Sequence, residues 1–141
     1  MPQSSSTASC QNTEGVFALS RHNQILGNFG ESFAVNFLRK NGYRILERNY
    51  KTKTAEIDII TQKGEYIIFI EVKTRQTENF GRPAEAVDRR KQQKIIAAAA
   101  TYMQDHPGVN ARFDVVEIIA DRHNGKFLPR EIEHIEEAFT C

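Results

Sequence analysis

The chain has 141 residues, of which 40% are hydrophobic and 26% charged, and its formal net charge at pH 7 is +1. This length predicts one domain with its own core, and the composition is typical of a soluble globular protein. No segment approaches the roughly 20 apolar residues of a membrane span, and the N-terminus has no apolar stretch of the kind found in secretory signals. Cys10 and Cys141 lie at opposite ends without partner spacing, so we expect reduced thiols and a cytoplasmic protein.

Basic and acidic residues are unevenly distributed along the chain. Between positions 39 and 94 there are 14 Lys/Arg against 8 Asp/Glu, whereas positions 105 to 141 carry 4 against 8. A basic centre beside an acidic end is a mild indication of a polyanionic partner. The four histidines share no ligand spacing, so the sequence suggests no zinc site.

The N-terminal residues 1–22 are rich in Ser, Thr and Gln and are predicted to form a disordered tail, followed by a single domain over 23–141. The first periodic segment has Phe29, Phe33 and Phe37 at every fourth position, which predicts a helix over about 27–41. Gly42 supplies its C-terminal stop.

The remaining segments alternate between strand and helix patterns. Strands are expected over 43–50, 55–62 and 65–75, with a turn at Lys63-Gly64 between the second and third. Pro83 is placed to open a long helix over about 83–105, and 112–120 reads as a fourth strand, followed by a strand or short helix. The order α-β-β-β-α-β predicts an α/β fold with a mixed central sheet flanked by helices.

The third strand ends in an unusual way. The run FIEVKTR places Glu71, Lys73 and Arg75 at alternate positions, and a side-chain period of two points all three the same way. If 55–62 and 65–75 form a hairpin, Glu56 and Asp58 share this face, and Asp58 lies either diagonal to Glu71 or directly opposite it. A one-residue bulge would instead put Asp58 on the other face.

Two carboxylates at the end of an apolar sheet are unfavourable unless positive charge lies beside them. Lys73 is one such charge, and a hard divalent cation such as Mg²⁺ is a better one because it prefers carboxylate oxygens. Glu31 falls inside the apolar arc of the first helix, where an acid is out of place unless it is used. The alternative to a metal site is that Glu71 and Lys73, and likewise Glu31, only form surface ion pairs.

The ordered set of motifs resembles a known group of nucleases. The run AEIDII, followed 13 positions after Asp58 by E-V-K, is similar to the metal-dependent nucleases of the PD-(D/E)xK, restriction-endonuclease-like superfamily, and most of all to archaeal Holliday-junction resolvases. Within it the chain resembles the YraN-like family of predicted bacterial endonucleases. GNFGESFAVNFLRKNGYRILERNY, FIEVKTR, RFDVVEI and HIEEAF extend the resemblance over about 27–139.

The resemblance implies a restriction-endonuclease-like core that hydrolyses DNA phosphodiester bonds with Mg²⁺, or with Mn²⁺ in its place. It does not exclude RNA as a substrate, and a homodimer is one expected state. It implies that Asp58 and Glu71 bind the metal, together with the Val72 carbonyl, that Lys73 is the catalytic lysine and that Glu31 completes the site. The sequence departs from the family at one position, because Ala55 stands where glycine is usual.

Basic side chains near the second helix are candidates for binding the nucleic-acid backbone: Arg75, Arg82, Arg89, Arg90, Lys91 and Lys94. The alternative to phosphate binding is that these basic side chains simply form the solvent-exposed face of the helix. Phosphate contacts would give salt-dependent binding without sequence preference. Two other functions stay open: a non-catalytic nucleic-acid-binding protein that keeps the fold, and a protein-interaction scaffold that uses the acidic segment 131–137.

Overall fold

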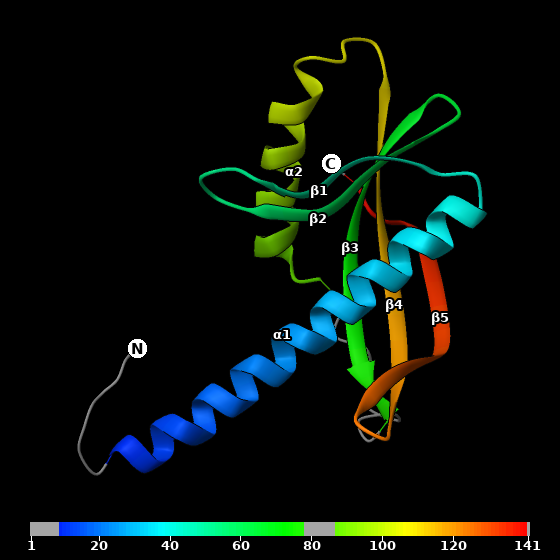
Figure 1. Cartoon of the computed structure of the whole chain (residues 1–141). Coiled ribbons are helices and arrows are strands. Elements are labelled where there is room, and N and C mark those ends of the chain that lie inside the picture. The colour runs from blue at the N-terminus through cyan, green and yellow to red at the C-terminus, as the bar shows by residue number, and fades with distance from the viewer. Residues whose placement is uncertain (1–8, 78–86, 141) are drawn as a thin grey trace.

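A mixed five-stranded sheet lies between two helices in the computed structural model, which describes residues 9–77 and 87–140, with side chains from residue 21 onward (Figure 1). The predicted α/β fold and its element order are confirmed. The elements are α1 (Ser9–Lys40), β1 (Arg44–Lys51), β2 (Glu56–Lys63), β3 (Tyr66–Gln76), α2 (Arg89–Met103), β4 (Asn110–His123) and β5 (Lys126–Phe139).

Several boundaries differ from those predicted. Helix α1 begins at Ser9 rather than near residue 27, so it takes in part of the segment that composition assigned to a tail. Helix α2 begins at Arg89, because the side chain of Asp88 caps it by accepting a 2.8 Å hydrogen bond from the backbone N–H of Lys91. Pro83, the predicted start, lies outside the described residues. The last segment is strand β5.

The sheet order is β1-β2-β3-β4-β5, and all neighbours are antiparallel except β3 and β4. Helix α2 connects these two parallel strands, as a crossover must. One apolar cluster packs α2 against one face of the sheet around Phe69 and Ile95, and another packs α1 against the opposite face around Leu38 and Ile70. In the described part of the chain, no helix combines the length and apolar character needed to cross a membrane.

Strands β2 and β3 pair only over part of their lengths. Their last pair is Ile59 with Ile70, and beyond it β3 continues beside β4 while β2 runs away from it with β1 (Figure 1). Of the two registers considered, this is the one that would place Asp58 opposite Glu71 if it continued one step further, but the pairing ends before these residues. We call the point where the strands diverge, immediately beyond this pair, the fork.

Gly30 sets how closely α1 approaches the sheet. A Cβ atom at this position would lie 1.8 Å from Thr74 Oγ1 and 2.9 Å from Thr74 Cβ on β3. We expect Gly30→Ala to push α1 away from β3 and to lower the free energy of unfolding by about 1–3 kcal/mol, as overpacked substitutions do. Urea denaturation followed by circular dichroism measures this change.

Gly27, one turn earlier in the same helix, is the matched control. A Cβ there meets nothing within 4 Å. Gly27→Ala should therefore raise the free energy of unfolding by about 0.5–1 kcal/mol, because alanine loses less backbone entropy in a helix than glycine. Equal effects of the two substitutions would contradict the close approach at Gly30.

Candidate functional site

The two acids of the predicted site reach the fork from different sides of the sheet. Ile57 packs in the cluster on the α2 side and Ile59 in the cluster on the α1 side, so the alternation of β2 breaks at Asp58. Asp58 lines a pocket beside α1, whereas Glu71 contacts α2. Of the two arrangements that the sequence left open, the structure therefore has the one in which an irregularity takes Asp58 off the face of Glu71, although the charges of the two acids still interact.

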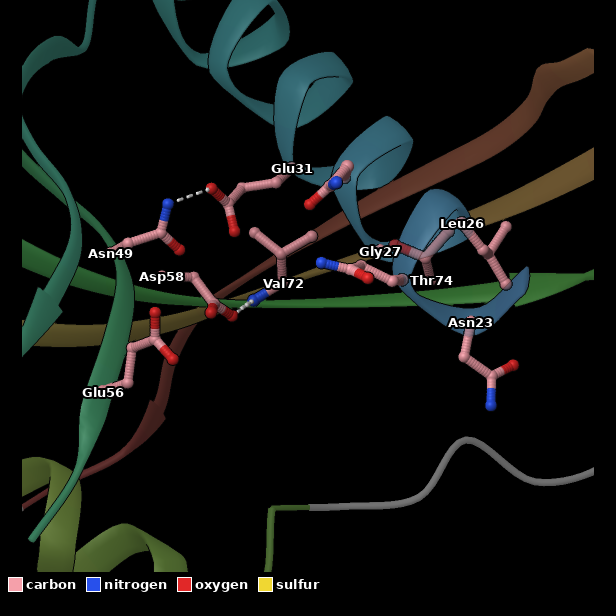
Figure 2. Close-up of a pocket in the computed structure, with 11 residues that line it drawn as sticks. Asn23, Leu26, Gly27, Glu31, Asn49, Glu56, Asp58, Val72 and Thr74 are labelled. Carbon is pink, nitrogen blue, oxygen red and sulfur yellow. Dashed lines mark hydrogen bonds between the residues drawn. The ribbon is translucent and has the colours of Figure 1, made fainter. Parts of the chain in front are cut away.

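A local irregularity in the neighbouring strand accompanies this break. Asn49 of β1 lies between Arg48 and Tyr50, the two residues that pair with Ile59 and Ile57, and its φ is 55°. Asparagine tolerates this left-handed conformation better than most residues. The irregularity turns the Asn49 side chain toward α1, on the same side as Asp58 (Figure 2).

Asp58 is held at the fork by the backbone of β3. Its Oδ2 accepts a 2.8 Å hydrogen bond from the N–H of Val72, the residue after Glu71 (Figure 2). Burial raises the pKa of Asp58 to about 7, and the negative charges of Glu71 and Glu31 add to this effect, while the Val72 hydrogen bond and Lys91 oppose it. The fork therefore disfavours the charged form of Asp58, mainly through burial and also through the two neighbouring acids.

Glu31 comes from the turn of α1 that faces this pocket. Its Oε1 accepts hydrogen bonds from Asn49 Nδ2 at 3.0 Å and from Arg48 Nη2 at 3.4 Å, and its side chain is 15% exposed. The structure thus places Glu31 where its charge acts on Asp58, and holds it there through β1 partners that the sequence did not indicate.

Glu71 is buried and forms an ion pair with Lys91 of α2. Although burial of the ammonium group acts in the opposite direction, the hydrogen bond to Glu71 and its charge raise the pKa of Lys91 above its ordinary value. Lys73, two residues along β3, is half-buried. Its ammonium group makes no hydrogen bond or ion pair with the side chains or backbone of the described residues.

A pocket of about 440 Å³ opens between α1 and the fork, and Figure 2 shows the acids at one end of it and Asn23 at the other. Its lining residues come from α1, from the edge strand β1, and from β2 and β3 on either side of the fork. They are Asn23, Gln24, Leu26, Gly27, Asn28, Glu31, Asn49, Glu56, Asp58, Val72 and Thr74.

The acids do not form a closed metal cage. Among the described residues, no three His, Cys, Asp or Glu side chains lie close enough together to hold an ion. Mg²⁺ does not need such a cage, because it keeps several waters and is usually bound by one or two carboxylates together with substrate phosphates. The burial of Asp58 and the two other acids whose charges act on it fit a cation held in this open manner.

The predicted DNA-binding residues separate into three groups. Arg90, Lys91 and Lys94 line a second pocket of about 330 Å³ at the start of α2, and Arg89 is exposed beside them. Arg75 instead lies against β4, with its Nε 3.5 Å from Glu117 Oε2 and its side chain 22% exposed. Arg82 lies outside the described residues.

Two partners of the site could not be found from the sequence. Asn49 reaches Glu31 because of a positive φ in the middle of a strand, which the pattern of β1 does not signal. The sequence places Lys91 in a basic run that suggests phosphate binding, and only the packing of α2 on the sheet shows that it meets Glu71.

Comparison with known proteins gives one family. The family model described as "Uncharacterised protein family UPF0102" matches residues 30–118. A UPF0102 protein of Chloroherpeton thalassium is 48% identical over 122 residues, which cover 83% of this chain and 95% of the relative. A UPF0102 protein of Dictyoglomus thermophilum is 48% identical, over 78% of this chain and 94% of the relative. A UPF0102 protein of Caldanaerobacter subterraneus subsp. tengcongensis is 42% identical, over 81% of this chain and 93% of the relative.

Proposed function

The chain belongs to the UPF0102 family, and from this premise and the geometry of the fork we propose that it is a metal-dependent nuclease that hydrolyses DNA phosphodiester bonds. The observation that carries the proposal is the charge at the fork. Burial there, together with the charges of Glu71 from β3 and Glu31 from α1, raises the pKa of Asp58 to about 7. Strongly perturbed acids beside a pocket are typical of catalytic sites.

An ion at the fork would be held by Asp58 from the α1 side, by Glu71 from the α2 side and by the Val72 carbonyl, and Glu31 would reach it through water. When bound, the divalent ion would acidify a water molecule and polarise the scissile phosphate. Lys73, which has no partner among the described residues, would orient that water and offset the charge that develops on the phosphate.

The start of α2 would bind the phosphates that flank the scissile one. Arg90, Lys91 and Lys94 gather there in one pocket, and the amide groups at a helix N-terminus also favour anions. Such contacts predict an affinity that falls as salt is added and that does not depend on sequence.

One observation favours the alternative, a nucleic-acid-binding protein without cleavage. The ion pair of Lys91 with Glu71 supplies, from the chain itself, positive charge that a metal would otherwise provide. A protein that never binds a metal would gain from this pair, so the two functions must be separated by experiment.

A cleavage assay tests the proposal. Linear, single-stranded and four-way DNA would be incubated with Mg²⁺, with Mn²⁺ or with EDTA, and products separated by gel electrophoresis. We expect cleavage with either metal and none with EDTA. Glu71→Gln should lower the rate by at least about a hundredfold, because the reaction loses a charged ligand of the ion while the hydrogen bond to Lys91 can remain.

Glu65→Gln is the matched control, since Glu65 is an exposed acid in the turn between β2 and β3, remote from the fork. This variant should cleave at the wild-type rate. DNA binding without metal-dependent cleavage of any of these DNAs would exclude the nuclease and favour the alternative.

A further inference from the structure

The pocket between α1 and the fork has two ends of different chemistry. Glu31, Glu56 and Asp58 lie at one end, and Asn23 lies at the other (Figure 2). The side chains at positions 23, 24 and 28 all carry carboxamides, and their spacing to position 31 places them along one side of α1. They are exposed, and no arginine or lysine is among the described residues that line this pocket.

The second pocket, at the start of α2, has the opposite character. It is lined by Arg90, Lys91 and Lys94, and it shares Glu56 of β2 with the first pocket. The two pockets are therefore neighbours on either side of β2. Cationic groups lie on the α2 side and uncharged hydrogen-bonding groups on the α1 side.

A nucleotide is divided in the same way into an anionic phosphate and an uncharged base. The acids at the fork repel a second phosphate, so an uncharged base suits the pocket beside α1 better than a further stretch of the backbone. Carboxamides both donate and accept hydrogen bonds, which matches the mixed donors and acceptors on a base edge. A volume of about 440 Å³ also falls within the range of pockets that bind small ligands.

We propose that the α1 pocket binds an unpaired nucleobase beside the phosphate that lies at the fork, with Asn23, Gln24 and Asn28 contacting its edge. This inference rests on the proposed function and names its substrate class. A base inside a duplex is stacked and must leave the stack before it can enter a pocket. The preferred substrate is therefore DNA with an unpaired nucleotide next to the scissile phosphate.

Fluorescence anisotropy in EDTA tests the inference without cleavage. Two labelled DNAs of equal length would be compared, one fully paired and the other carrying a single unpaired nucleotide. We expect the wild-type protein to bind the second at least about fivefold more tightly, in line with the discrimination that amide–base contacts provide. The double variant Asn23→Ala/Asn28→Ala should lose this preference.

The salt dependence of binding provides a second readout. The amides carry no charge, so the double variant should retain the wild-type slope of affinity against salt. Asn36→Ala is the matched control, because Asn36 is an exposed asparagine of α1 that does not line the pocket, and it should retain both the preference and the slope.

Equal binding of the two DNAs by the wild-type protein, or a preference that survives in the double variant, would overturn the inference. Neither result would affect the nuclease proposal, which fails separately if no metal-dependent cleavage occurs. A loss of preference in Asn36→Ala as large as in the double variant would also overturn it, because the effect would then not belong to the pocket.

Discussion

Asp114→Ala should lower the free energy of unfolding by about 3–5 kcal/mol, the range measured when one partner of a buried ion pair is removed. Asp114 is fully buried. Its carboxylate accepts hydrogen bonds from Arg112 Nε at 3.0 Å and Nη2 at 2.8 Å, and it pairs with His134 Nε2 at 2.7 Å. Removal of the carboxylate leaves the guanidinium and the imidazole without this acceptor.

The same carboxylate also stabilises an irregular part of the β4–β5 ladder. The register shifts between Phe113 and Val115, and Glu137 on the opposite strand has a φ of 50°. Asp114 Oδ1 accepts a 3.0 Å hydrogen bond from the N–H of Glu137. The substitution therefore removes both a charge partner and the support for a residue in an unfavourable backbone conformation.

Urea denaturation measured as a function of pH distinguishes charge from packing at this position. Burial acts to raise the pKa of Asp114, but the hydrogen bonds from His134 and Arg112 outweigh it and lower the pKa below 3.8. The stabilisation is therefore present above pH 4 and is lost as the pH falls below that value. Asp114→Asn, which preserves the shape, should be less destabilising than Asp114→Ala, and equal effects would contradict a role for the hydrogen bonds.

Asp58→Asn is expected to stabilise the metal-free protein at neutral and higher pH, on the order of 2–4 kcal/mol. The pKa of Asp58 is about 7 in the folded chain, whereas its ordinary value is 3.8. Between these values the folded state retains a proton that the unfolded state has lost, so the wild-type protein loses stability as the pH rises from about 4 to about 7. Asparagine keeps an acceptor for the Val72 N–H and carries no charge.

The measurement is a thermal or urea unfolding series from pH 4 to pH 8 in EDTA. The variant and the wild type should be close in stability near pH 4, and the variant should be the more stable above pH 7. Added Mg²⁺ should stabilise the wild type at pH 8 and have little effect on the variant, because binding to the folded state alone shifts the equilibrium. A variant that is less stable than the wild type at pH 8 in EDTA would contradict the buried charge at the fork.

The sequence by itself determined the element order and the position of the β2–β3 hairpin. Apolar periodicity identified the helix around Phe33, and the turn at Gly64 fixed the β2–β3 hairpin and limited its register to two choices. These features are local, since each depends on residues close together in the chain. The side-chain period of two in strands and of 3.6 in helices can be read directly from such short segments.

Only the tertiary structure decided which partners the acids have. The break of alternation at Asp58 coincides with an irregular backbone at Asn49 in the adjacent strand, and the pairing of Glu71 with Lys91 follows from how α2 packs on the sheet. Both depend on contacts between distant segments. A sequence pattern specifies which face a side chain occupies in a regular strand, but it does not specify where the strand becomes irregular or which charge a neighbouring element brings to it.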